Sequence, residues 1–146
     1  MSQNRPEVLS RSVQETDTWL KELADELRVE NANQAYGALR AVLHAVRDRL
    51  PVDMSAHLAA QFPVMVAGIY YDGWKPAAVP NGIRSSGEFI ENVRDRSRGH
   101  EELDPAFSIQ CVFRLIERKV EPGQIRKLVD QLPEDLRELW PGNPRR

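Results

Sequence analysis

The strongest constraint on the fold of this chain is a similarity between its two halves at a fixed spacing of 70 residues. Gln61-Phe62-Pro63 aligns with Gln131-Leu132-Pro133, and the same spacing aligns apolar residues without a gap. The aligned apolar pairs are Trp19 and Phe89, Leu20 and Ile90, Leu23 and Val93, Val42 and Val112, Leu43 and Phe113, Val46 and Ile116, Leu58 and Leu128, Val66 and Leu136, Ile69 and Leu139, and Tyr70 and Trp140. This pattern predicts an internal duplication. Each half is near the lower size limit for a stable domain, so the two halves are expected to pack against each other.

Apolar residues recur at spacings of three and four in both halves, which is typical of amphipathic helices and not of strands. The spacing predicts four helical segments in each half. The first segment opens at Thr16-Asp17 or at Ser85-Ser86, where Ser85 and Glu88 fit a capping box. We therefore predict an all-α fold, a compact helical bundle of roughly seven or eight helices.

Prolines and turn-forming residues predict the limits of the two halves. The fourth segment is expected to begin at Pro63 or Pro133, because a proline is tolerated in the first turn of a helix. The predicted parts are a flexible N-terminal segment (1–14), a first helical repeat (15–71), a linker (72–84), a second helical repeat (85–140) and a flexible tail (141–146). The linker is long enough for the second half to fold back on the first, so the repeats are expected to form one structural domain.

The stretch from about Thr16 to Trp140 also resembles a known protein family. The resemblance rests on the order and spacing of the segments 38–51, 61–63, 70–76, 88–93 and 131–133, with the closing pair Leu139-Trp140. These segments are similar to those of an uncharacterised, mostly bacterial family known as domain of unknown function 2267. Phe62 stands where the family more often has leucine. The resemblance implies a compact helical domain with two related halves, and it implies no activity, cofactor or catalytic residue.

The charge balance argues against capture of polyanions. The chain has 20 basic and 22 acidic residues and a net charge of −2, so it has no broad positive field for nucleic acid or an anionic membrane. The arginines between 94 and 98 have acids beside them, which favours solvated ion pairs. The longest apolar run, 62–71, is interrupted by Pro63 and Gly68 and is about half the length that a bilayer span needs. We expect no membrane span and no nucleic-acid partner.

No residue pattern in the chain is typical of an enzyme or a metal site. His100-Glu101-Glu102 is similar to part of a zinc-protease motif, but Asp104 stands where the second histidine is required. Cys111 lies among apolar residues and is expected in the core. A single cysteine forms no internal disulfide, and with no recognisable signal peptide it favours a cytoplasmic location. We expect no catalytic residue, cofactor or metal, although a site assembled from scattered residues would escape sequence reasoning.

Arg40, His44 and Arg47 share a helical face and form a possible polar patch. We expect His44 to be solvated beside the two arginines, whose like charge lowers its pKa. His57 is also expected at an exposed position, because its counterpart at the spacing of 70 is the polar residue Lys127.

The segment 64–71 is apolar all round, whereas its counterpart 134–140 is polar on one side. A helix without a polar face must be covered on every side. The expected explanation is a central position between the halves, and the alternative is an exposed patch that contacts another chain. The residues of this possible interaction surface are Val64, Met65, Val66, Ile69, Tyr70, Tyr71 and Trp74.

Three functional hypotheses follow. The favoured one is a non-enzymatic helical interaction or adaptor module, which binds a partner protein or associates with itself. The second is a binder of a small molecule or lipid in a cleft between the halves, suggested by the aromatic residues around the linker. The third is weak nucleic-acid association through the arginine clusters.

Overall fold

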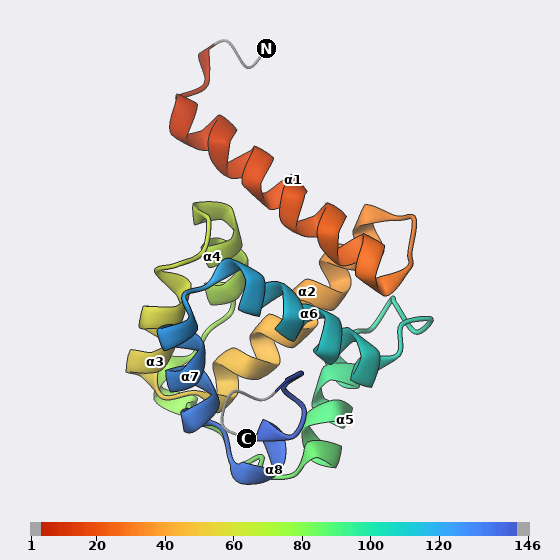
Figure 1. Cartoon of the computed structure of the whole chain (residues 1–146), viewed down its shortest axis with the longest axis vertical. Helices are drawn as coiled ribbons and strands as arrows, with labels where there is room; N and C mark the ends of the chain where they lie inside the picture. The colour runs from red at the N-terminus through yellow and green to blue at the C-terminus, as the bar shows by residue number, and fades with distance from the viewer. Residues whose placement is uncertain (1–3, 143–146) are drawn as a thin grey trace.

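The computed structural model describes residues 4–142, and within this range every regular element is a helix. The elements are α1 (Glu7–Leu27), α2 (Ala32–Arg49), α3 (Val52–Ala59), α4 (Val64–Tyr71), the 3-10 turn η2 (Pro76–Ala78), α5 (Ser86–Arg96), α6 (Pro105–Lys119), α7 (Pro122–Gln131) and α8 (Glu134–Arg137). The helices pack together into one bundle (Figure 1), and their buried side chains form one continuous apolar core. The predicted all-α fold is confirmed. None of the described helices is long and apolar enough to cross a lipid bilayer.

Helix α2 lies at the centre of the bundle. It contacts α1, α4, α5 and α6, and every residue from Ala41 to Arg47 is buried. A helix with buried residues on all sides is covered all round. The expectation that segment 64–71 is the central element is therefore wrong: α4 contacts α1, α2 and α3 and lies at the side of the bundle (Figure 1).

Helix α1 begins at Glu7 and not at Thr16-Asp17, so residues 7–14, expected to be flexible, are helical. Its buried stripe is Ser12, Thr16, Trp19, Leu23 and Leu27. Because Ser12 and Thr16 are polar, the apolar pattern of the sequence does not include them in the stripe. The Thr16 hydroxyl donates a hydrogen bond to the Ser12 carbonyl oxygen at 2.7 Å, so this buried polar group has a partner. Residues 1–3 and 143–146 of the predicted flexible ends lie outside the described residues.

The predicted starts of α4, α5 and α8 agree with the structure to within one residue. Ser85 and Glu88 form the predicted capping box: the Ser85 side chain accepts from the Glu88 amide at 3.1 Å, and the Glu88 carboxylate accepts from the Ser85 amide at 3.3 Å. Pro63 and Pro133 each lie one residue before the helix and not in its first turn. These local signals therefore locate the helix starts to within one residue.

The two halves are joined by apolar packing and by ion pairs. Helix α2 packs on α5 and α6, and α1 packs on α6. Between α1 and α6, Glu22 accepts from Lys119 at 2.8 Å, and Glu26 accepts from Arg118 at 2.8 Å. The segment 72–84 connects the halves without an α-helix, and its Asn81 amide donates to the Asp48 carbonyl oxygen at 2.8 Å.

Many apolar residues that lie 70 positions apart share their burial. Both members are buried in the pairs Trp19 and Phe89, Leu23 and Val93, Leu39 and Ile109, Ala41 and Cys111, Val42 and Val112, Leu43 and Phe113, Val46 and Ile116, Leu50 and Val120, Leu58 and Leu128, Phe62 and Leu132, Val66 and Leu136, and Tyr70 and Trp140. The order of helices in the first half, α1 to α4, also matches the order α5 to α8 in the second. The duplication itself stays a prediction.

Candidate interaction surface on helix α4

Helix α4 has a buried and an exposed face. Val66 and Tyr70 are fully buried, whereas the side chains of Val64 and Met65 are 67% and 43% exposed. Ile69, Tyr71 and Trp74 of the predicted surface are half-buried. Only part of that surface is therefore accessible. We call Val64 and Met65 the α4 outer face.

The buried face of α4 is held by an aromatic cluster. The Tyr70 ring meets the Phe62 ring edge to face at 5.6 Å, and Phe62 meets Trp19 of α1 in the same way at 5.4 Å. The Tyr70 hydroxyl shares a hydrogen bond with the Ser55 hydroxyl at 2.8 Å. Burial raises the pKa of Tyr70 far above its ordinary value, so this hydroxyl stays protonated. The cluster joins α1, α3 and α4 into one rigid unit.

The polar patch of Arg40, His44 and Arg47 binds the C-terminal end of α4. The structure brings the three residues together as expected, but His44 and Arg47 are only 4% and 3% exposed, so the expectation of a solvated His44 is wrong. His44 Nε2 donates to the Ile69 carbonyl oxygen at 2.7 Å. Arg47 Nη1 donates to the carbonyl oxygens of residues 70 and 72, and Arg40 pairs with the Asp72 carboxylate at 3.5 Å. The last carbonyl groups of a helix have no hydrogen-bond donors within the helix, and the side chains of this patch supply those donors.

The patch is electrostatically balanced by Asp48. Asp48 accepts from Arg47 Nε at 2.8 Å and from Arg96 of α5 at 2.8 Å. Burial alone raises the pKa of Asp48, but the hydrogen bonds from these arginines outweigh it and hold the pKa below its ordinary value. Burial lowers the pKa of His44 to about 4, and the like charges of Arg47 and Arg40 contribute to the shift. The predicted direction is confirmed, with burial as the larger cause.

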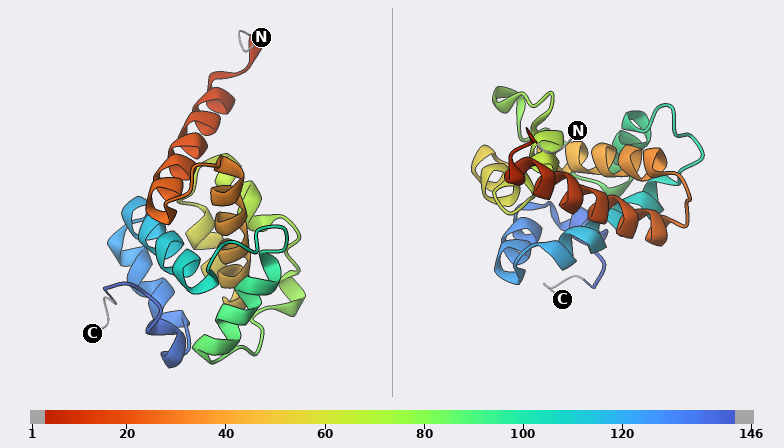
Figure 2. Two further views of the ribbon diagram at one scale, coloured as in Figure 1. Left: turned by 90° about the vertical axis from the view of Figure 1, so that its right-hand side faces the viewer. Right: turned by 90° about the horizontal axis from the view of Figure 1, so that it is seen from above.

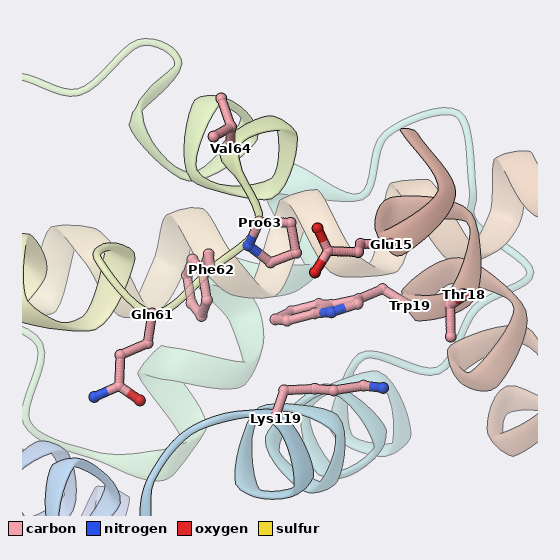
Figure 3. A pocket seen from close by; sticks show the side chains of 8 residues that line it. All are labelled: Glu15, Thr18, Trp19, Gln61, Phe62, Pro63, Val64 and Lys119. Atoms are coloured by element: carbon pink, nitrogen blue, oxygen red, sulfur yellow. The ribbon is translucent and has the colours of Figure 1, made fainter. Parts of the chain in front are cut away.

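A cleft of about 470 Å³ lies beside the α4 outer face. Its residues come from α1, from the connection between α3 and α4, from the first residue of α4 and from α6: Glu15, Thr18, Trp19, Gln61, Phe62, Pro63, Val64 and Lys119. Figure 3 shows the Trp19 ring between the side chains of Glu15 and Lys119. Lys119 belongs to the second half and the other residues to the first. The cleft therefore combines an aromatic ring with one charge of each sign at the junction of the halves.

Sequence reasoning missed the exposed start of α1. Val8 and Leu9 are 60% and 49% exposed, and they precede Ser12 of the buried stripe by four and three residues. The first turns of α1 project beyond the other helices in two directions of view (Figures 1 and 2). The Ser12 hydroxyl accepts from the Met65 amide at 2.9 Å and marks where α1 leaves α4. The spacing of Val8 and Leu9 from Ser12 and Thr16 was the available signal.

The sequence also singled out Cys111, His57 and His100, which lie elsewhere in the part of the chain that the structure describes. Cys111 is buried as predicted, and burial raises its thiol pKa to about 11. His57 and Lys127 are both exposed, as predicted, and line a separate cleft. His100 packs against Gly37, and no group of three or more metal-ligating side chains occurs among residues 4–142.

The arginines of α5 are paired with acids, as the sequence indicates. Arg94 pairs with Glu91 at 3.0 Å, and Arg96 pairs with Asp48 at 2.8 Å. Paired guanidinium groups are less available for phosphate contacts. The observed geometry gives nucleic-acid binding no specific support.

The fold and these contacts define a small all-helical domain with a partly exposed apolar helix at its side. The family model for the uncharacterized conserved proteins called DUF2267 matches residues 16–139, and the chain belongs to this family. The match covers the bundle from within α1 to just before Trp140 and leaves out the exposed first turns of α1. No curated protein matches the chain.

Proposed function

We propose that this chain is a non-enzymatic helical interaction module that binds a partner protein through the α4 outer face and the adjoining cleft. The exposure of the neighbouring residues Val64 and Met65 carries the proposal. Single exposed apolar residues are ordinary on protein surfaces. An adjacent exposed pair beside a cleft is typical of a contact site, because apolar anchors supply most of the binding energy at interfaces.

The equivalent positions of the second half support this proposal. We infer that the halves derive from a duplication, as the shared burial pattern supports. At the spacing of 70, Val64 corresponds to Glu134 and Met65 to Asp135, and all four residues are exposed. Acids are favourable in the first turn of a helix, where they meet the positive end of the helix dipole. The apolar residues of α4 are therefore not required to start the helix, and we assign them to contact with a partner.

The support beneath α4 also suits a binding surface. His44 and Arg47 fix the end of the helix, and the ring cluster fixes its buried face. A surface that is ordered before binding loses little conformational entropy when the partner arrives. We propose a cytoplasmic location for the module, which fits its single buried and unpaired cysteine, because disulfides form in oxidising compartments.

A small-molecule site in the cleft is the second candidate. The cleft volume of about 470 Å³ lies within the usual range for ligand pockets, and the small exposed edges of Trp19 and Phe62 form part of its wall. Ligands that enter it would quench Trp19 fluorescence and raise the melting temperature. A Thr18→Trp variant, which fills the cleft from the exposed side, would abolish both effects.

Site-specific photo-crosslinking in the native cell tests the interaction module. A crosslinking side chain at Val64 is expected to capture a defined protein, and the matched control at Glu134 is expected not to. The double substitution Val64→Glu and Met65→Asp copies the second half and should keep the fold while weakening binding of the purified partner at least about tenfold. Equal capture from both positions, or unchanged affinity of the folded double variant, would overturn the proposal.

A further inference from the structure

The connection between α1 and α2 differs from all the other helix connections in the described chain. Each other connection contains a proline or is followed directly by one: Pro51, Pro63, Pro76, Pro105, Pro122 and Pro133. Residues 28–31, Arg-Val-Glu-Asn, contain neither proline nor glycine. Prolines prevent two helices from fusing into one, because they lack the amide and clash with the preceding turn. Only this connection is free to become helical.

The same connection carries backbone strain. Arg28 has φ 62° and ψ 42°, and it is the one residue other than glycine with positive φ in residues 4–142. The left-handed conformation closes α1 through the hydrogen bond from the Val29 amide to the Ala24 carbonyl oxygen at 3.0 Å. Glycine usually occupies this position, because a Cβ atom makes the conformation unfavourable. A continuous helix through residues 28–31 would remove this strain.

The contacts of α1 with the rest of the bundle are suited to exchange between two copies. Trp19, Leu23 and Leu27 fill the core from one side, and Glu22 and Glu26 pair with Lys119 and Arg118 of α6. All of these contacts would re-form if α1 of one copy occupied the same place in another. The first turns of α1 already extend beyond the other helices (Figure 2).

We propose that two copies of this chain exchange their α1 helices, with residues 28–31 joining α1 and α2 into one continuous helix in each copy. The exchanged contacts are the ones already seen within one copy, so the balance between monomer and dimer depends on the connection and on concentration. Strain at Arg28 favours exchange. The Asn31 side chain, which caps α2 by accepting from the Asn33 amide at 2.7 Å, opposes it. The exchange does not use the α4 outer face, so it goes beyond the function proposed above.

A pair of charge-reversed variants tests the exchange directly. The first copy carries Glu22→Arg and Glu26→Arg, and the second carries Arg118→Glu and Lys119→Glu. Each copy alone brings like charges together between α1 and α6. In an exchanged dimer of the two, both α1–α6 contacts join opposite charges. The two copies are mixed in urea and refolded together. The mixture should then contain about tenfold more dimer than either copy refolded alone, as measured by sedimentation velocity.

The wild-type chain provides a second, independent test of the exchange. After refolding at millimolar concentration it should contain a dimer that persists for hours after dilution, because separation requires α1 to leave the core. Arg28→Gly relieves the strain and weakens the joined helix, so it should lower the dimer fraction about tenfold. Asn31→Ala should raise it. A monomeric mixture of folded charge-reversed copies would overturn the exchange, and so would a wild-type chain that refolds only as a monomer. Either result leaves the crosslinking test at Val64 unaffected.

Discussion

Arg47 Nη1 on α2 lies 2.7 Å from the carbonyl oxygen of Asp72, directly beyond the last turn of α4. The same nitrogen donates to the Tyr70 carbonyl oxygen at 3.1 Å, and the guanidinium is buried. A side chain of the central helix α2 thus holds the end of the peripheral helix α4 through the backbone carbonyl oxygens of α4 and of the residue that follows it. This contact determines how α4 presents its outer face.

Arg47→Ala is expected to lower the free energy of unfolding by about 3 kcal/mol, because it leaves the Tyr70 and Asp72 carbonyl oxygens without this donor and leaves Arg96 as the remaining arginine partner of Asp48. Urea denaturation measures the loss. Arg94→Ala, which removes an arginine whose side chain is 59% exposed, is the control and should change stability by less than about 0.5 kcal/mol. Equal effects of the two substitutions would contradict the assigned role of Arg47.

The buried His44 makes stability depend on pH. Its pKa is about 4 in the folded chain, against an ordinary value of 6.5. Between these values the unfolded chain binds a proton that the folded chain does not, so the free energy of unfolding falls as the pH drops from 6.5 to 4. The contribution of His44 is fully present above pH 6.5, and its loss approaches about 3 kcal/mol at pH 4.

The variant His44→Gln isolates this effect, because a glutamine amide can still donate to the Ile69 carbonyl oxygen. The difference in unfolding free energy between wild type and variant, measured from pH 7 to pH 4, should shrink or reverse across this window. A difference that stays constant with pH would show that His44 is not buried in the neutral form.

The same substitution at two valines of α4 should change stability by very different amounts. Val64→Asp places an acid at an exposed first-turn position and should change stability by less than about 0.5 kcal/mol. Val66→Asp buries a charge without a partner and should cost about 4 kcal/mol or more. Thermal unfolding followed by circular dichroism distinguishes them, and similar melting temperatures would mean that α4 is oriented differently.

Gly37 on α2 permits a close approach of the loop before α6. A Cβ atom at this position would lie 2.5 Å from His100 Cδ2. Gly37→Ala should therefore destabilise the chain by about 1 to 3 kcal/mol, although alanine is the better helix former. In the His100→Ala background the same substitution should become neutral or stabilising. A double-mutant cycle with no coupling between the two positions would contradict this contact.

Sequence reasoning located the apolar stripes well and misjudged one helix start. The spacing of Trp19, Leu23 and Leu27 predicts the inner part of α1 correctly. Ser12 and Thr16 continue the same stripe but are polar, so periodicity alone could not reveal that they are buried. They are buried because α4 lies beside them and supplies the Met65 amide as a donor, a contact that depends on the tertiary arrangement.

The polar patch on α2 shows that sequence periodicity also could not predict which residues of the candidate site are buried. Spacing predicts that Arg40, His44 and Arg47 share a face, and they do. The counterparts of His44 and Arg47 at the spacing of 70, Arg114 and Glu117, are exposed. The difference arises because the end of α4 covers the first pair, and the sequence of α2 contains no signal for the position of that helix end.

Oxidative labelling of methionine tests the proposed contact on α4 most directly. Met65 is 43% exposed and Met54 is 7% exposed, so in dilute purified protein Met65 should oxidise several-fold faster. Inside the native cell a bound partner should cover Met65 and bring its rate close to that of Met54. A Met65 rate in the cell equal to that of the dilute purified protein would contradict the assignment of the α4 outer face as a contact surface.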